Sequence, residues 1–219
     1  MNHAAVGARP RSIVWELMGA LSGVATVAFF IAAFVLRGDD ELEPGRSSAQ
    51  ISAELARVSD KIEVSAYLVL VAMLMFIWFL GYIRRYLLGA EGEGGWLTPV
   101  AYGGGLVSVG VLLGFLALDF GLTAISDYAA DVQIAKTLIA LQWNYVWLFA
   151  PPLIAFTVAA SAVIIRFRAL PIWLGWLGVP VALSLLAPWM GVPLFYGWVL
   201  LLSLVLTYWA LRTSNGVSG

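Results

Sequence analysis

Long apolar runs separated by short polar segments dominate the pattern of this sequence. A helix that crosses a bilayer core of about 30 Å needs about 20 apolar residues. Six runs approach this length, at about 13–36, 64–88, 97–118, 141–165, 171–188 and 193–211. The pattern therefore predicts an all-α integral membrane bundle of six transmembrane helices, with tails at 1–12 and 212–219. The last two runs are short, so re-entrant loops stay an alternative there.

Two segments between the runs have the periodicity of amphipathic helices. The first lies in loop 37–63, where Ser47 and Gln50 fit a capping box and apolar residues recur at helical spacing, namely Ile51, Leu55, Val58 and Ile62. The second covers residues 122–143. We expect two extracytoplasmic amphipathic helices. The first lies on the outer membrane surface, forms a lid over the bundle or extends the second span.

Composition agrees with a membrane protein and excludes several kinds of site. The chain is 62% hydrophobic and 11% charged, against about 45–50% and about 25% in soluble domains. Its net charge of −1 indicates no nucleic-acid surface. Without cysteine there is no thiolate metal site, and His3 precedes the first run, which removes histidine ligands within the membrane. No run contains lysine or a pair of midplane acids. We expect no catalysis, no cofactor and no metal site.

The distribution of charge predicts the orientation in a bacterial plasma membrane. On one side, the tails, the turns near 84–96 and 166–171 and the start of the first run hold seven basic and three acidic residues, whereas the opposite loops hold five basic and ten acidic residues. Because cytoplasmic loops carry the excess of Lys and Arg, both termini are predicted to be cytoplasmic. Tryptophans near the ends of the runs fit two interfacial belts.

The stretch GYIRRYLLGAEGEGGWLTP, residues 81–99, predicts a cytoplasmic hairpin bend. It lacks the GxxxxGK[ST] phosphate loop and the strand context of a dinucleotide fingerprint. Thr98 is expected to cap the next helix, and Pro99 suits its first turn. Anionic lipid headgroups would favour four arginines on this side, which are Arg84, Arg85, Arg166 and Arg168.

The segments LGYIRRYLLGAEGEGGWL and LPIWLGWLG resemble a group of uncharacterised actinobacterial membrane proteins with six transmembrane helices, of the domain-of-unknown-function kind. The resemblance covers most of the chain from Val64 to Leu186. It implies a six-helix fold and a membrane location. It implies no activity.

Acidic residues near the membrane admit two interpretations. Glu16 lies at the start of the first run, where we expect it to pair with Arg84 or Arg166. Asp119, placed at the outer interface, could join Asp127 and Asp131 in an outward-facing cation site. A solvated acidic face explains the same three residues.

The fourth run is the candidate for ligand binding. Its two adjacent prolines should bend the helix and free backbone carbonyls, and transporter sites often lie at interrupted helices. The candidate ligand-binding residues are Gln142, Asn144, Trp147, Pro151, Pro152 and Thr157. The alternative is that the prolines serve shape alone.

Two GxxxG pairs predict close helix packing, because small residues let backbones approach within the membrane. They are Gly19 with Gly23 and Gly110 with Gly114. The pairs would serve the internal bundle, or else a partner subunit or a second copy of the chain.

These observations favour a non-catalytic multi-pass membrane protein that is a small subunit or scaffold of a membrane complex. The alternative is a solute-binding or transport protein, such as a substrate-capturing transporter component, with its site at the kinked fourth helix. A third hypothesis, an enzyme that acts on lipid, lacks a nucleophile or base beside the four arginines.

Overall fold

A computed structural model of the chain describes residues 13–38, 42–43, 45–127 and 132–215. Every element in those ranges is a helix. The elements are α1 (Ile13–Arg37), α2 (Ser48–Glu91), α3 (Leu97–Asp127), α4 (Val132–Tyr145), the 3₁₀ turn η1 (Val146–Phe149), α5 (Ala150–Phe167), α6 (Ile172–Ser184) and α7 (Pro188–Asn215). The predicted all-α class is confirmed.

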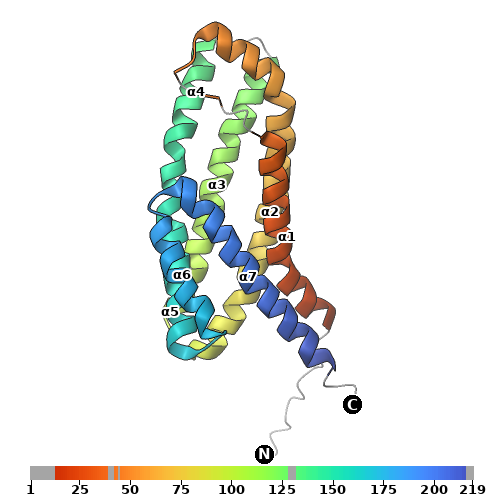
Figure 1. Cartoon of the computed structure of the whole chain (residues 1–219), viewed down its shortest axis with the longest axis vertical. Helices are drawn as coiled ribbons and strands as arrows, with labels where there is room; N and C mark the ends of the chain where they lie inside the picture. The colour runs from red at the N-terminus through yellow and green to blue at the C-terminus, as the bar shows by residue number, and fades with distance from the viewer. Residues whose placement is uncertain (1–12, 39–41, 44, 128–131, 216–219) are drawn as a thin grey trace, which may run out of the picture.

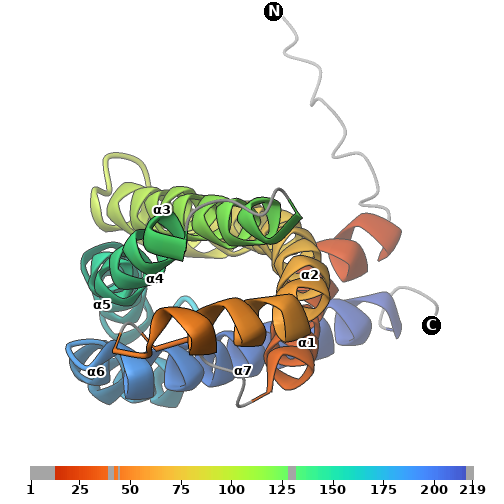
Figure 2. The ribbon, with the colours of Figure 1, turned by 90° about the horizontal axis from the view of Figure 1, so that it is seen from above.

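The helices pack side by side in a closed circuit. In turn, α1 packs on α2, α2 on α3, α3 on α5, α5 on α6 and α6 on α7, which returns to α1 (Figures 1 and 2). The first residue of α1 and the last residue of α7 lie at the same end of the bundle, together with the turns 92–96 and 168–171. We call this end the inner end, and the opposite one the outer end.

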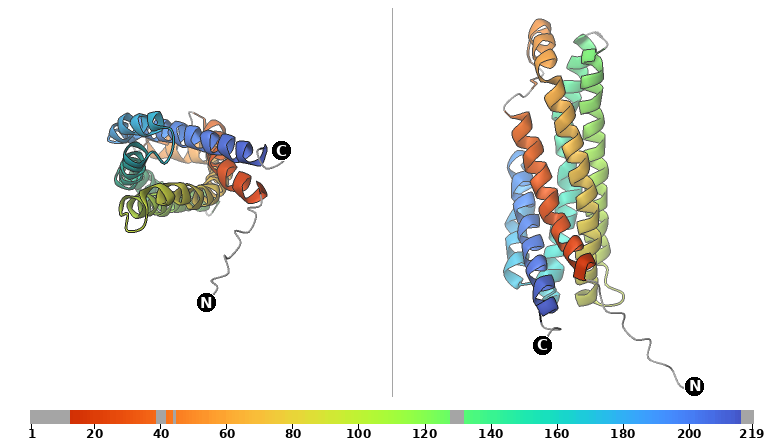
Figure 3. Two further views of the ribbon diagram at one scale, coloured as in Figure 1. Left: turned by 90° about the horizontal axis from the view of Figure 1, so that it is seen from below. Right: turned by 90° about the vertical axis from the view of Figure 1, so that its right-hand side faces the viewer.

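Within the described residues, five helical segments are long and apolar enough to cross a membrane, by length and composition. They are α1, α2, the greater part of α3, the run Val132–Phe167 and α7 as far as Arg212. The predicted fifth span, 171–188, is shorter in the structure. The 13 residues of α6 rise about 20 Å, and Pro188 already belongs to α7. Figure 3 shows that the α6–α7 hairpin reaches only part of the height of α2 and α3.

Of the alternatives for the first amphipathic segment, the structure bears out an extension of the second span. The first is the beginning of α2, a continuous helix of 44 residues whose first turns arch across the outer end (Figure 1). The predicted capping box is confirmed, since the Gln50 N–H donates to Ser47 Oγ at 3.4 Å and the Ser47 N–H donates to Gln50 Oε1 at 2.9 Å. The second segment is divided between the end of α3 and α4.

The apolar face predicted for the first amphipathic segment is confirmed. Its four apolar residues are at most 4% exposed and form a second apolar cluster with Leu122 of α3 and with Ala135 and Ile139 of α4. This cluster lies at the outer end. It fixes the beginning of α2 against α3 and α4 without any need for lipid.

Aromatic rings fill the centre of the circuit. Phe76 of α2 lies 6.1 Å from Phe156 of α5 and 6.2 Å from Phe195 of α7, centroid to centroid. All three side chains are at most 2% exposed. Edge-to-face rings pack efficiently, so these residues join three helices that are distant in sequence. The Trp198 Nε1–H also donates to the Leu174 carbonyl of α6 at 2.9 Å.

At the bend predicted for the fourth run, the helix changes from α to 3₁₀ and back to α. The turn η1 separates α4 from α5, and both prolines lie in the first turn of α5. A first turn has no helical acceptor for its N–H groups, so proline costs little there. The Trp147 carbonyl, which faces this break, accepts the N–H of Ala150.

The GxxxG pairs differ in their surroundings. A Cβ on Gly19 would lie 2.3 Å from the Tyr82 ring, and one on Gly23 would lie 2.7 Å from the Phe79 ring. Both glycines therefore serve internal packing of α1. In the second pair, Gly114 faces Tyr145 inside the bundle, whereas a Cβ on Gly110 would meet no heavy atom within 4 Å. Only one member of that pair makes a close internal contact.

Replacing Gly23 by leucine is expected to destabilise the bundle, because the added side chain would meet Phe79 of α2 and Ser203 of α7. Overpacking of this kind costs about 1–3 kcal/mol. The measurement is the free energy of unfolding in mixed micelles. Gly110→Leu is the matched control, since it makes the same change where there is open space. Equal stability of the two variants would contradict the close approach of α1.

Candidate functional site

A buried ionic cluster joins three helices at the outer end. The Arg37 guanidinium makes two hydrogen bonds to the Asp119 carboxylate, Nη1 to Oδ2 at 3.0 Å and Nη2 to Oδ1 at 2.8 Å. Gln142 Nε2 donates to Asp119 Oδ1 at 2.6 Å. The Asp119 side chain is 1% exposed and that of Arg37 is 28% exposed. The last turn of α1 is thereby tied to α3 and α4.

This geometry changes the interpretation of Asp119. We predicted an interfacial carboxylate that could contribute to a cation site, but both its oxygens accept hydrogen bonds from protein groups. The two other members of the predicted acidic group, the Asp127 side chain and Asp131, lie outside the described residues. Within the residues that are described, no group of three or more acidic or histidine side chains could hold a metal ion.

Trp143 of α4 adds a second connection beside this cluster. Its Nε1–H donates to the Leu42 carbonyl at 2.9 Å, in the segment that follows α1. Its ring lies 5.7 Å from that of Trp189 in the first turn of α7. Trp143 thereby connects α4 to the segment after α1 and to the start of α7.

A second ionic cluster lies at the inner end, between α1 and α2. The Arg85 guanidinium makes a two-point contact with the Glu16 carboxylate, with 2.8 Å from Nη1 to Oε1 and a second bond from Nη2 to Oε2. The Tyr82 hydroxyl donates to Glu16 Oε2 at 3.1 Å. We expected Glu16 to pair with Arg84 or Arg166. It pairs with Arg85 because α2 turns that side chain toward α1.

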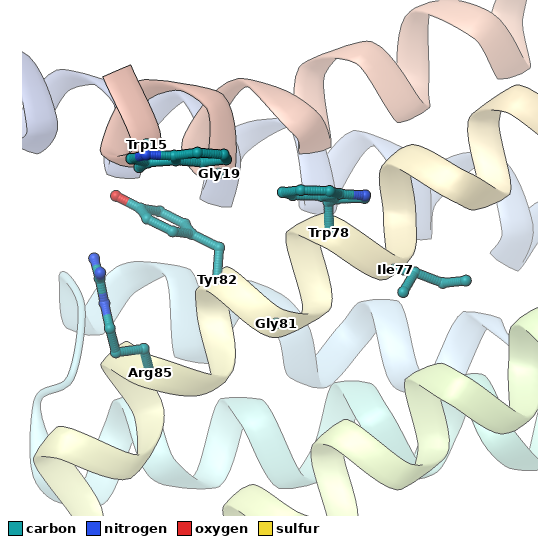
Figure 4. A pocket seen from close by; sticks show the side chains of 7 residues that line it. All are labelled: Trp15, Gly19, Ile77, Trp78, Gly81, Tyr82 and Arg85. Atoms are coloured by element: carbon teal, nitrogen blue, oxygen red, sulfur yellow. The ribbon is translucent and has the colours of Figure 1, made fainter. Parts of the chain in front are cut away.

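A groove opens beside this inner cluster, on the outside of the bundle (Figure 4). Its volume is about 360 Å³. Trp15 and Gly19 of α1 form one wall and α2 forms the other. The lining residues of α2 are Ile77, Trp78, Gly81, Tyr82 and Arg85. In Figure 4, Arg85 lies at one end of the groove and Ile77 at the other.

The glycine-rich turn at 92–96 is held by Glu91. Its carboxylate accepts the backbone N–H groups of Leu97 and Thr98, each at 2.8 Å, and so caps the start of α3. Gly95 leaves room for it, since a Cβ there would lie 2.3 Å from the Glu91 side chain. The predicted cap was Thr98. The Thr98 hydroxyl is instead buried and has no hydrogen-bond partner within the described residues.

The other arginines assigned to lipid headgroups also lie at the inner end, and their side chains are exposed. Arg84 lies over the Tyr102 ring, with 5.5 Å from Cζ to the centroid. Arg166 and Arg168 lie at the end of α5, where Arg168 is the C-cap in a left-handed conformation. Arg166 and Arg168 therefore belong to a different helix from either member of the Glu16–Arg85 pair.

The residues predicted to bind a ligand at the fourth run point to different surroundings. Gln142 faces Asp119, whereas Asn144 is exposed and donates to the Ala140 carbonyl at 2.8 Å. Thr157 is buried and donates to the Leu153 carbonyl of its own helix. Trp147 is 54% exposed. Pro151 is exposed and Pro152 is buried. The structure brings only Gln142 into a polar cluster that spans several helices.

Sequence reasoning missed Arg37 as the partner of Asp119. A signal was present, because Arg37 ends the first run and Asp119 follows the third, so both lie at the same membrane interface. An arginine and a buried carboxylate at one depth are candidates for a two-point pair. The distance of 82 residues along the chain concealed the pairing.

Replacing Arg37 by glutamine is expected to cost about 3–5 kcal/mol of unfolding free energy, because it leaves a buried carboxylate without its cation. Asp119→Asn should cost less, about 1–3 kcal/mol, since the partly exposed Arg37 can turn to water. The double variant should recover part of the loss. Denaturation in mixed micelles measures each term.

Arg57→Gln is the control for this comparison. Arg57 pairs with Glu54 on the surface, and exposed pairs contribute about 0–1 kcal/mol. A loss in Arg37→Gln no larger than in Arg57→Gln would show that the outer cluster does not stabilise the bundle.

Replacing Glu91 by alanine is expected to loosen the start of α3, because two backbone N–H groups lose their acceptor. Loss of a helix cap costs about 1 kcal/mol. Hydrogen exchange should be faster at the Leu97 and Thr98 amides in this variant. Glu93→Ala changes an exposed carboxylate of the same turn and should leave these amides unaffected. Similar exchange in both variants would refute the capping role.

Comparison with protein-family models, curated proteins and solved structures finds no match for this chain. The resemblance of Val64–Leu186 to six-helix actinobacterial proteins therefore stays a prediction. What the chain does has to be argued from its own residues and their geometry.

Proposed function

We propose that this chain is a non-catalytic multi-pass membrane protein that serves as a small subunit or scaffold of a membrane complex. The observation that carries the proposal is the way its two acidic groups at the ends of α1 are paired. Asp119 is held by Arg37 and Gln142, and Glu16 is held by Arg85 and Tyr82. An ionisable group within a membrane is usually a sign of transport or catalysis, but these two join helices.

The distribution of apolar surface supports the same proposal. Large apolar side chains are exposed around the α6–α7 turn, where Leu183 is 65%, Leu186 is 66% and Met190 is 69% exposed. Such a surface can face lipid or the helices of another subunit. The described residues lie mostly in apolar helices, and a contribution made within the membrane fits them.

Six membrane crossings with both termini in the cytoplasm are part of this proposal. The excess of basic residues at the inner end supports it, and so does the position of the start of α1 and the end of α7 at that end (Figure 1). The short length of α6 does not change the side of the membrane on which the chain ends. A hairpin that crosses twice and a hairpin that enters and returns both leave the chain on the side where it began.

Solute binding at the fourth run is the alternative function, and it has weaker support. Its candidate side chains divide between an exposed surface, a helix interior and the outer ionic cluster. A transport site would need several of them to converge on one ligand. No specific contact in the described residues favours that arrangement over the subunit role.

The proposal predicts that the full chain, extracted with its surrounding bilayer from its own membrane, carries a second polypeptide. Native mass spectrometry should give one stoichiometry for the complex in two different membrane-extracting polymers. Mixing labelled and unlabelled membranes before extraction controls for association after lysis, which would produce mixed complexes.

Three outcomes would contradict the proposal. They are a chain alone, a complex of this chain with itself alone, and a chain that carries one discrete solute. The last outcome would instead support the solute-binding function.

A further inference from the structure

The groove between α1 and α2 has the shape of a trough rather than a gap between round helices. Ile77, Gly81 and Arg85 recur every fourth residue along one line of α2, and Trp78 and Tyr82 form the adjacent line. Residues four apart lie on one helix face. From Ile77 to Arg85 the trough follows α2 for about 12 Å.

Two glycines produce this trough for different reasons. Gly19 lets α1 approach the face of the Tyr82 ring, as its Cβ would lie 2.3 Å from that ring. Gly81 leaves its floor open, because a Cβ there would meet no heavy atom within 4 Å. Between them, the rings of Trp15 and Trp78 rise from α1 and α2 and are 62% and 48% exposed (Figure 4). The result is an apolar, aromatic trough that is open on the outside of the bundle.

The inner end of the trough holds a guanidinium that is paired with a carboxylate. The Arg85 guanidinium lies 4.9 Å from the Tyr82 ring centroid and 5.3 Å from that of Tyr86, and the contact with Glu16 fixes its plane. Its side chain is still 43% exposed. The two bonds to Glu16 use one N–H on each terminal nitrogen, and a guanidinium carries five. Arg84, the preceding residue, faces α3 and lies over the Tyr102 ring, so it adds positive charge to the inner end of the bundle outside the trough.

We propose that the trough is a specific site for one membrane phospholipid, with an acyl chain along Gly81 and the phosphate on Arg85. The exposed guanidinium of Arg85 and the basic residues at the inner end of the bundle select this occupant, because guanidinium groups bind phosphate oxygens through directed hydrogen bonds. The volume of about 360 Å³ lies within the range of ligand clefts, about 300–1,000 Å³. Tryptophan rings beside an arginine match the boundary between headgroups and acyl chains.

This site is independent of the subunit role. It would be occupied whether or not a second polypeptide is present, and it uses the face formed by α1 and α2. The bound lipid would fill a surface that the helices leave concave, and so would stabilise the contact between α1 and α2 at the inner end.

The test is retention of lipid by the full chain. The protein is reconstituted with phosphatidylglycerol or with diacylglycerol of the same acyl chains, extracted in mild detergent and examined by native mass spectrometry. The expected result is one phosphatidylglycerol for each chain and no retained diacylglycerol, which lacks the phosphate. Equal retention of the two lipids, or retention of neither, overturns the proposal.

Gly81→Leu is the variant that fills the trough. Displacing about two buried methylene groups of the acyl chain should weaken retention of phosphatidylglycerol about tenfold. Gly110→Leu is the matched control, since it is an equal change at an exposed glycine with open space on α3, and it should retain lipid as the unchanged protein does. Equal retention by both variants would place the lipid elsewhere.

A second pair of variants keeps the test decisive if Gly81→Leu does not fold. Trp78→Ala removes one wall of the trough and should lower retention. Trp176→Ala, at a tryptophan of α6 that is 60% exposed outside the trough, should not. If the unchanged protein gives the mass of a dimer with no bound lipid, and this dimer is lost in Trp78→Ala, the trough is a contact between copies of the protein instead.

Discussion

A charged group that enters the edge of a bilayer must bring its partner, since water is no longer there to solvate it. This constraint determines both ends of the bundle. At the outer end it joins Arg37 to Asp119, across 82 residues of sequence. At the inner end it joins Glu16 to Arg85. Each pair includes a residue of α1, so the helix that begins the fold is fixed at both of its ends. These contacts help to set the position of α1 relative to α2 at the inner end and relative to α3 at the outer end.

Between those ends, packing rather than charge holds the helices. Lipid provides no hydrophobic force between helices, so close contact and ring packing have to stabilise the bundle. Gly19 and Gly23 bring α1 against the rings of Tyr82 and Phe79. Phe76, Phe156 and Phe195 then fill the centre from three helices. The glycines and the large rings are therefore complementary, because the rings of α2 occupy the space that the glycines of α1 leave.

The periodic features of the fold could be predicted from the sequence, and the pairwise ones could not. Apolar runs predicted both ends of α1 and the start of α3 closely, and helical spacing identified the buried face of Ile51 to Ile62. The extension of the second span by that segment was one of the alternatives that the pattern left open. The partner of Glu16 was predicted incorrectly, because the rotation of α2 decides between Arg84 and Arg85. The cap of α3 was also wrong, because Glu91 reaches over Gly95, which no local rule anticipates.

The Glu16–Arg85 pair and two glycines determine where the trough lies. A two-point Glu16–Arg85 contact requires α1 and α2 to meet at their inner ends, and Gly19 sets the distance at which they meet. One turn before Arg85, Gly81 provides no side chain to fill the angle between the helices. A bilayer leaves no empty space beside a protein, so a lipid chain must occupy that angle. The ion pair that stabilises α1 therefore also presents a guanidinium to whichever headgroup belongs to that chain.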